Sequence, residues 1–256
     1  MENLQQLNKR QNEIYQLLLS AGEIKIQDLT EIFSVVEMTI RRDLDKMEKL
    51  GFLKRTYGGA ILAFEDIVIN TRELLNRRAK ELIGQKAVKF VQEGESIFVD
   101  AGTTTPYFVK NLPVDAKLSI TTNALNVAAK IYGENKEKII LGGMIRESTS
   151  SLYGPIAMST LNNLSFHKAF LAASGFTLNQ GFSNSNIFEV EIKQKVIKQS
   201  REITFLVDHS KFDTQFMHKI TSLENINRII TDREPSNQYC KLIQSSGVEL
   251  VVCSSN

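Results

Sequence analysis

The chain has 256 residues, of which 42% are hydrophobic and 23% charged, and its formal net charge is +2. This length predicts about two domains, and the composition is that of a globular protein rather than of a fibrous or disordered one. Two cysteines are too few for a disulfide framework, and no apolar run reaches the roughly 18 residues of a membrane span. Because the N-terminus is polar, we expect no signal peptide and a cytoplasmic protein.

The first sixty or so residues are predicted to form three short helices and a hairpin. Apolar residues recur at helical spacing in three segments, and a Gly-Gly pair at 58–59 marks the turn of the hairpin. The expected elements are a helix that ends near residue 21, helices at 26–33 and 37–50, and strands at 52–56 and 60–62.

The third helix has one apolar and one basic face. Ile40, Leu44 and Met47 recur at steps of four and three residues, which predicts a buried face. From Arg41 to Arg55 there are six basic residues against three acids, in a chain that is otherwise almost neutral. The candidate DNA-contacting residues on the outer face and in the hairpin are Met38, Thr39, Arg41, Arg42, Lys46, Lys49, Lys54 and Arg55.

A short helix, a tight turn and a second helix with a basic outer face is typical of a helix-turn-helix, whose second helix enters the major groove of DNA. Arginines there pair with guanine edges or phosphates, and the basic hairpin would be a wing on the DNA backbone. The alternative is a solvated helix whose basic residues only pair with Asp43, Asp45 and Glu48. The three-helix context favours DNA binding. Because such modules bind DNA in symmetric pairs, we expect a homodimer or larger homo-oligomer.

Residues 63–76 have weak periodicity, and we interpret them as a linker between two domains, 1–62 and 77–256. Beyond them, apolar runs alternate with amphipathic stretches of helix length. This alternation predicts a parallel sheet that is covered by helices on both faces. The runs expected to form strands are 96–100, 118–121, 139–141, 169–173, 203–207, 228–231 and 248–252.

Polar residues follow several of these strands, at the end of the sheet where ligands bind in such folds. The loop from Asp100 to Thr105 combines a glycine with threonine hydroxyls, which suits an anionic ligand, although helix capping alone would also explain it. Asp100 would accept from a sugar hydroxyl or brace the turn. Gly143 would leave room for a ligand, and Lys193 and Lys211 are the candidates to neutralise a phosphate. The pattern predicts one pocket for a small polyhydroxyl anion.

The sequence also resembles a known family. The segments T-I-R-R-D-L at 39–44, G-F-L-K-R at 51–55 and Y-G-G-A at 57–60 are similar to the winged helix-turn-helix signature of the DeoR family of bacterial repressors. V-D-A-G-T-T-T, T-T-N-A, L-G-G, E-I-K and D-H-S-K-F resemble, in order, the sensor domain of the family. The resemblance implies an α/β protein in which a winged helix-turn-helix precedes a Rossmann-like parallel-sheet sensor domain, similar to ribose-5-phosphate isomerase.

One position departs from the family pattern. Val36 stands where the family usually has a serine that caps the recognition helix. Valine has no side-chain acceptor, and loss of such a cap costs roughly 0.5–2 kcal/mol. Ser34 and Glu37 are the nearby residues that would substitute for it.

The resemblance implies a sequence-specific transcriptional regulator, a repressor of a carbohydrate-utilisation operon, that binds a double-stranded DNA operator and responds to a phosphorylated sugar. It implies no cofactor, and the three histidines lack metal-ligand spacing. Either Glu189 or Glu191 would accompany Lys193. The implied effector-binding residues are Asp100, Gly102, Thr103, Thr104, Thr122, Asn123, Gly143, Lys193, Asp208 and Lys211.

The alternative function is a sugar-phosphate isomerase-like enzyme with a fused DNA-binding module. An isomerase needs a carboxylate base beside the substrate carbon, and Asp100, Asp208 or one of the two glutamates would supply it. The fused DNA-reading module and the lack of an acid-rich catalytic loop favour the regulator. We therefore expect no catalytic residues.

Overall fold

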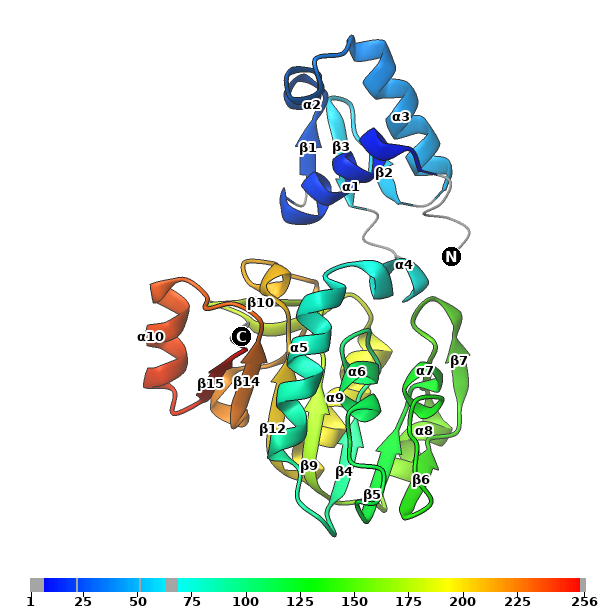
Figure 1. Ribbon diagram of the computed structural model, residues 1–256, viewed down its shortest axis with the longest axis vertical. Helices are drawn as coiled ribbons and strands as arrows, with labels where there is room; N and C mark the ends of the chain where they lie inside the picture. The colour runs from blue at the N-terminus through cyan, green and yellow to red at the C-terminus, as the bar shows by residue number, and fades with distance from the viewer. Residues whose placement is uncertain (1–6, 22, 51, 63–68, 254–256) are drawn as a thin grey trace. The chain divides into compact units, whose positions relative to one another are not determined.

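The computed structural model describes residues 7–21, 23–50, 52–62 and 69–253, and the chain divides into two compact units, Met1–Leu74 and Leu75–Asn256 (Figure 1). Residues 63–68, the start of the predicted linker, lie outside the described residues. Helix α4 (Ile69–Leu74) forms most of the rest of it, so the linker bounds stay a prediction. None of the helices in the described ranges is long and apolar enough to span a membrane.

The first unit contains the predicted three helices and hairpin, with one additional strand. The helices are α1 (Lys9–Ala21), α2 (Ile26–Phe33) and α3 (Glu37–Lys49), and the strands are β1 (Glu23–Lys25), β2 (Leu53–Arg55) and β3 (Gly59–Leu62). The strands form an antiparallel sheet in the order β1-β3-β2. Strand β1 has three residues, too few to show a period in the sequence. Its approach to β3 requires Gly59, where a Cβ would lie 1.9 Å from the Ile24 carbonyl oxygen.

The second unit is built on a seven-stranded sheet in which every neighbouring pair is parallel. Its order is β15-β14-β12-β9-β4-β5-β6. All seven predicted strands are confirmed. They are β4 (Ser96–Val99), β5 (Leu118–Thr122), β6 (Lys136–Ile140), β9 (Phe166–Leu171), β12 (Ser200–Leu206), β14 (Arg228–Thr231) and β15 (Glu249–Val252).

Helices cover both faces of this sheet, as predicted (Figure 1). One face packs against α5 (Arg77–Ala87), α6 (Thr105–Lys110) and α7 (Leu125–Ala128). The other packs against α8 (Pro155–Leu161), α9 (Ile187–Gln199) and α10 (Asn237–Ser245). Short 3₁₀ turns occupy Val88–Phe90, Glu147–Thr149, His209–Lys211 and Leu223–Asn225. Consecutive strand residues, such as Ile97 and Phe98, enter opposite cores, which is why these strands read as continuous apolar runs.

Two smaller β structures interrupt the expected alternation of strands and helices. A hairpin of β7 (Met144–Arg146) and β8 (Ser151–Tyr153) follows β6, and a three-stranded antiparallel sheet contains β10 (Gly175–Thr177), β11 (Gly181–Asn184) and β13 (His218–Thr221). No α-helix of the described chain separates β12 from β14; β13 lies there instead. The small sheet packs on the large one through the stacked rings of Phe176, Phe182 and Phe205. Strands of three or four residues carry too little pattern to be predicted.

The strand order reverses beside β4. From β4 the chain proceeds to β5 and β6 in one direction, returns to β9 on the other side of β4, and continues outward to β12, β14 and β15. In open α/β sheets, ligands bind beyond the carboxyl ends of the strands at such a reversal. The fold therefore directs attention to the loops that follow β4 and β9.

Candidate functional sites

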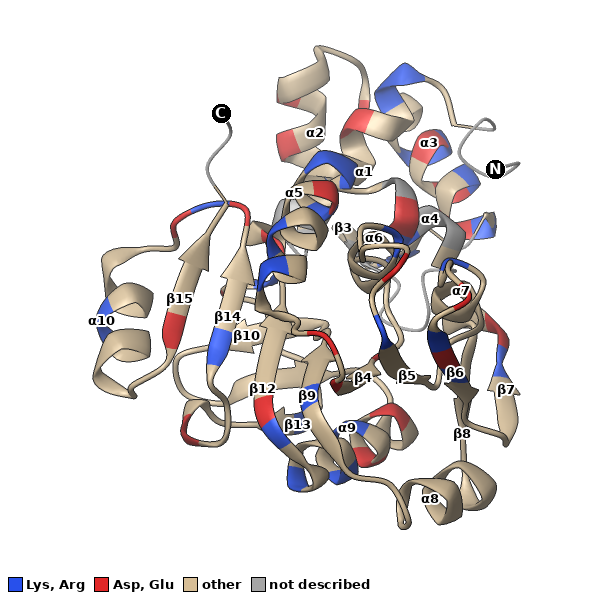
Figure 2. Cartoon of the chain, turned by 60° about the horizontal axis from the view of Figure 1, so that its bottom comes forward, with Lys and Arg blue, Asp and Glu red and all other residues tan. Residues whose placement is uncertain are grey.

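Helix α3 has the two faces that the sequence predicts. Its buried side is formed by Ile40, Leu44 and Met47, each fully buried. On the other side Met38 is 60% exposed, and Arg42 and Lys49 are exposed, as is Lys54 on β2. Figure 2 shows Lys and Arg interleaved with Asp and Glu along this helix. Among the described residues Arg42, Lys49 and Lys54 have no ion pair, so their charges are available to a polyanion.

The nearby acids have separate roles. Asp43 is buried and accepts hydrogen bonds from Arg10 Nε (2.6 Å) and Gln11 Nε2 (2.7 Å), which fix α1 against α3. The suggestion that it pairs with the basic face is therefore wrong, because its side chain lies on the inner side of the helix. Asp45 forms an ion pair with Arg55, and Glu48 accepts from the Arg55 N–H at 2.7 Å, so Arg55 is held against α3.

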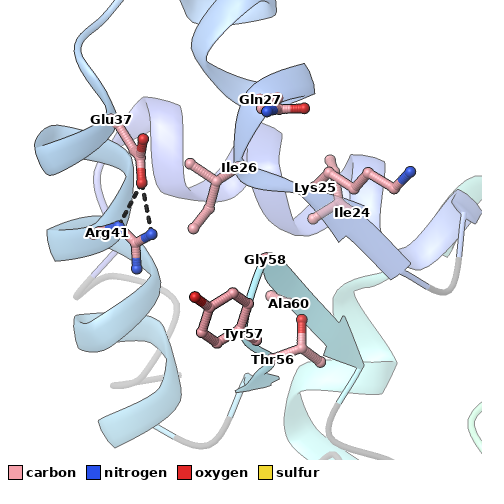
Figure 3. Close-up of a pocket in the computed structure, with 11 residues that line it drawn as sticks. Ile24, Lys25, Ile26, Gln27, Glu37, Arg41, Thr56, Tyr57, Gly58 and Ala60 are labelled. Carbon is pink, nitrogen blue, oxygen red and sulfur yellow. Dashed lines mark hydrogen bonds and ion pairs between the residues drawn. The ribbon is translucent and has the colours of Figure 1, made fainter.

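Arg41 borders a cavity between α3 and the hairpin. Its Nε donates to Glu37 Oε1, one helical turn earlier, at 2.7 Å (Figure 3). Both side chains line a cavity of about 400 Å³ that also involves the start of α2 and the hairpin loop 56–60. Tyr57, in that loop, is fully exposed. A DNA backbone that entered between α3 and the hairpin would meet Arg41.

The start of α3 lacks a side-chain cap. Val36 is the N-cap residue, and among the described residues no side chain caps the first turn. Neither expected substitute supplies the cap: Ser34 is the left-handed C-cap of α2 (φ 51°), and Glu37 is paired with Arg41. Thr39, which is partly buried, donates its N–H to the Val36 carbonyl at 2.9 Å. Lys46 is exposed on the last turns. The helix is thus held by packing and by Asp43 rather than by its cap.

In the second unit, Asp100 joins the strand ends at the reversal point. It is 1% exposed, and its Oδ2 accepts from the Lys193 ammonium on α9 and from the Ala172 N–H (3.0 Å) after β9. Asn123, after β5, accepts from the Ala101 N–H through Oδ1 at 3.1 Å. Burial raises the pKa of the Asp100 carboxyl, and the Lys193 charge opposes this shift. Lys193 is 2% exposed, so in this structure its charge is held by Asp100 and not presented to a ligand.

The loop 102–105 has backbone N–H groups that donate to no acceptor in the described structure. Across the described chain, the backbone N–H groups of Gly102, Thr103, Thr104 and Thr105 have no hydrogen-bond partner, and Thr105 Oγ1 is fully buried without one. A Cβ at Gly102 would lie 3.0 Å from the Ala172 Cβ, so the close approach of the loop after β9 favours glycine here. Successive unpaired N–H groups of this kind form a concave site for anionic oxygens.

Glu189, rather than Glu191, accompanies Lys193. It is buried one helical turn before Lys193, whereas Glu191 is exposed. Glu189 Oε1 accepts from Ser151 Oγ at 3.1 Å, and its Oε2 accepts from Asn184 Nδ2 at 2.6 Å. The glutamate thus ties α9 to the β7–β8 hairpin and to the small sheet.

A second polar cluster lies at the end of β12. Asp208 is 1% exposed, and its Oδ1 accepts from Asn76 Nδ2 (3.0 Å) and from the N–H and hydroxyl of Ser210. Burial opposes ionisation of Asp208, but Lys211, Ser210 and Lys80 together outweigh it, so its pKa lies below the usual range. Since β9 lies between β4 and β12, this cluster and the Asp100 loop occupy neighbouring parts of the same sheet end.

Two of the predicted pocket residues serve the fold locally. Gly143 has φ 134°, and a Cβ there would lie 2.4 Å from the Tyr153 carbonyl oxygen. The space beside it is filled by the β7–β8 hairpin, so the expectation that it leaves room for a ligand is wrong. Thr122 Oγ1 accepts from the Ala124 N–H at 3.1 Å and caps the turn before α7. No cluster of His, Cys, Asp and Glu that would hold a metal occurs in the described ranges.

Several polar residues of these sites have no motif in the sequence. They come from outside the large sheet and are Asn76, just before α5, Lys80 on α5, Asn184 on β11 and Ser151 on β8. The sequence carried a signal for one further contact residue, Glu189: it lies four residues before Lys193, and residues at this spacing share a helix face.

Comparisons with known proteins cover both units. The profile of the DeoR-like helix-turn-helix domain matches residues 10–65, and that of the DeoR C terminal sensor domain matches residues 75–233. The uncharacterized HTH-type transcriptional regulator YulB of Bacillus subtilis is 36% identical, over 94% of this chain and 95% of its own. The glycerol-3-phosphate regulon repressor of Escherichia coli K12 is 29% identical, over 96% and 98%.

Solved structures are more distant. Ribose 5 phosphate isomerase A from Neisseria gonorrhoeae has 16% identity and a TM-score of 0.37, over 57% of this chain and 56% of its own. The Pyrococcus horikoshii OT3 translation initiation factor eIF-2B has 12% identity and a TM-score of 0.47, over 87% and 95%. These scores describe only a loose likeness of backbone.

The Asp100–Lys193 pair predicts non-additive effects on stability. Asp100→Asn and Lys193→Met should each lower the free energy of unfolding by about 3–5 kcal/mol, because each leaves one buried charge unpaired. The double variant should lose much less than the sum, since no charge remains. Urea unfolding followed by circular dichroism measures this, with Lys198→Met on the exposed side of α9 as the control. Additive losses would contradict the pairing.

Proposed function

This chain belongs to the DeoR family of helix-turn-helix regulators, and we propose that it is a sequence-specific DNA-binding transcriptional regulator that represses a carbohydrate-utilisation operon. The observation that carries the proposal is the outer face of α3, where Arg42 and Lys49 are exposed and have no ion pair with any described residue, while Ile40, Leu44 and Met47 on the opposite face are fully buried. The glycerol-3-phosphate regulon repressor and a putative aga operon repressor among its relatives support the carbohydrate assignment.

The proposed DNA complex uses two elements of the first unit. Helix α3 enters the major groove, where Arg42 reaches base edges or phosphates and Met38 offers an apolar contact. The β2–β3 hairpin lies along the backbone as a wing, with Lys54 toward the phosphates. Arg41 borders the cavity between them and would contact a phosphate there after leaving Glu37.

The effector is proposed to be a phosphorylated sugar bound at the strand ends of the second unit. Four unpaired N–H groups and the Thr105 hydroxyl supply donors for a phosphate. Asp100 and Asp208 supply carboxylate oxygens for sugar hydroxyls. Lys211 adds positive charge beside Asp208. A ligand with an anionic end and a polyhydroxyl end would use both sets of groups.

The same geometry favours sensing over isomerisation. A general base must be free to take a proton from the substrate. Asp100 is ion-paired with Lys193, and both oxygens of Glu189 already accept hydrogen bonds. Turnover of pentose or hexose phosphates, followed by NMR, would contradict this assignment and support the isomerase alternative.

For DNA binding, Arg42→Ala should weaken operator binding by about 1–3 kcal/mol, or about 5- to 150-fold. Because the Arg42 side chain has no ion pair in the described structure, the melting temperature should not change. Fluorescence anisotropy on a duplex selected from a random library by the wild-type protein measures the affinity. Arg201→Ala, which removes an exposed arginine of the second unit, is the matched control. Wild-type affinity of Arg42→Ala at physiological salt would show that α3 does not read the operator.

For the effector, a thermal-shift screen of sugar phosphates should find a stabilising ligand. At a concentration of a hundred times its Kd, such a ligand raises the free energy of unfolding by about 2.7 kcal/mol. Thr105→Val should raise the Kd of that ligand about tenfold, because it removes a hydrogen-bond donor. The stability of the protein without the ligand should not fall, since the Thr105 hydroxyl has no hydrogen-bond partner among the described residues. Thr160→Val on α8, whose hydroxyl already donates to Ile156, is the control for loss of a hydroxyl. Equal affinity of Thr105→Val and wild type would remove this loop from the site.

A further inference from the structure

The second unit carries an exposed apolar patch at the β6 edge of its sheet. Six large apolar side chains, each 42–64% exposed, lie on β6, the β7–β8 hairpin, α8 and the start of α9. They outnumber the four other exposed large apolar residues of the described part of this unit. We call this surface the hairpin patch, and its members are Ile140, Met144, Ile145, Ile156, Ile187 and Phe188.

Contacts across the patch make it one surface. A Cβ at Gly154 would lie 2.6 Å from the Met144 Cε, which brings β7 against the start of α8. The Phe188 ring, at the start of α9, stacks on the Tyr153 ring of β8 with centroids 5.0 Å apart. Helix α8 packs on both β8 and α9. The apolar side chains are therefore neighbours rather than scattered single residues, and contiguous patches of this kind mark interaction surfaces.

The hairpin and α8, which build most of the patch, are almost free of charge. Residues 140–145 and 148–161, from the end of β6 to the end of α8, contain no Asp, Glu, Lys or Arg, although 23% of the chain is charged. Helix α8 accordingly shows no charged residue in Figure 2. Arg146 and Glu147 lie at the tip of the hairpin, outside these runs. Ile145 and Ile156 are exposed within these runs, so burial alone does not explain the lack of charge.

This composition points to the partner. In a two-fold symmetric interface the same patch meets itself, so a charge near the axis would face a like charge. The uncharged side chains of the hairpin and α8 avoid this repulsion, and interface cores are depleted in charge and enriched in aromatic and Met side chains. The outer edges of β6 and β7 are also unpaired in the described sheets, so a second copy can approach without displacing a strand.

We propose that the hairpin patch is the interface through which two copies of this chain form a symmetric dimer. The proposal rests on the proposed function, because a helix-turn-helix regulator reads paired half-sites and needs a second copy. What the proposal adds is the surface on which the second copy binds. Since Ser151 of the hairpin and Glu189 at the start of α9 are hydrogen-bonded to each other, the interface borders the network that surrounds Asp100 and Lys193.

Sedimentation velocity of the full chain tests the interface. Wild type should sediment as a dimer at micromolar concentration. Ile145→Glu and Ile156→Glu should each raise the dimer Kd by about 100-fold or more. In a two-fold symmetric dimer, each substitution places the new carboxylate of one copy against that of the other copy or against apolar surface. Val114→Glu changes a residue of similar exposure (61%) outside the patch and should stay dimeric. Circular dichroism checks that all three variants fold.

The outcomes separate this inference from the proposed function. A monomeric wild type, or a dimer that survives both substitutions, overturns the interface. A dimer that Ile156→Glu dissociates supports it, whether or not any DNA duplex is bound. If the operator is found, the monomeric variant should retain weak binding to a half-site and lose the tight binding to the full site. Undiminished binding to the full site by a monomer would also overturn the proposal.

Discussion

The ion pair of Asp100 and Lys193 holds the centre of the second unit together. Both groups are almost completely buried, and either charge alone would be costly there. The pair connects the end of β4 to α9, and the second bond of Asp100 Oδ2, to Ala172, connects it to the end of β9. The Asp100 carboxylate thus links the strand ends and α9 at the point where the strand order reverses. The loop that follows is left with donors only, which is the requirement for an anionic ligand.

This arrangement connects the candidate site to other elements of the fold. Lys193 is paired with Asp100 in this structure, and a phosphate bound in the loop 102–105, as proposed above, would compete for the same ammonium. Any shift of Lys193 acts on α9, which also carries Glu189 and its bonds to the β7–β8 hairpin and the small sheet. Asp208 has a comparable position, since it binds Asn76 at the start of α5, two residues after the boundary of the first unit. Both carboxylates therefore connect the candidate pocket to elements outside it.

Helix α3 of the first unit has one charged residue that faces inward beside one that faces outward. Asp43 faces inward and fixes α3 to α1, whereas Arg42, its neighbour in sequence, faces outward. Two neighbouring residues thus supply the anchor of the helix, Asp43, and an outward-facing charge, Arg42, which the proposed DNA complex uses. The absent cap at Val36 is tolerated because the anchor and the buried apolar face determine where α3 lies.

The sequence by itself determined the order and type of the main elements. Helical spacing identified α2 and α3, and apolar runs identified all seven strands of the large sheet, because both patterns repeat over enough residues to be read locally. The basic face of α3 and the polar loop after β4 were also visible. Only the tertiary structure decided which side chains meet. It paired Lys193 with Asp100, chose Glu189 over Glu191, gave Asp208 the partner Asn76, and turned Gly143 from an expected opening into a packing contact. These partners lie up to 132 residues apart, and they are set by strand order and helix placement, which no local spacing encodes.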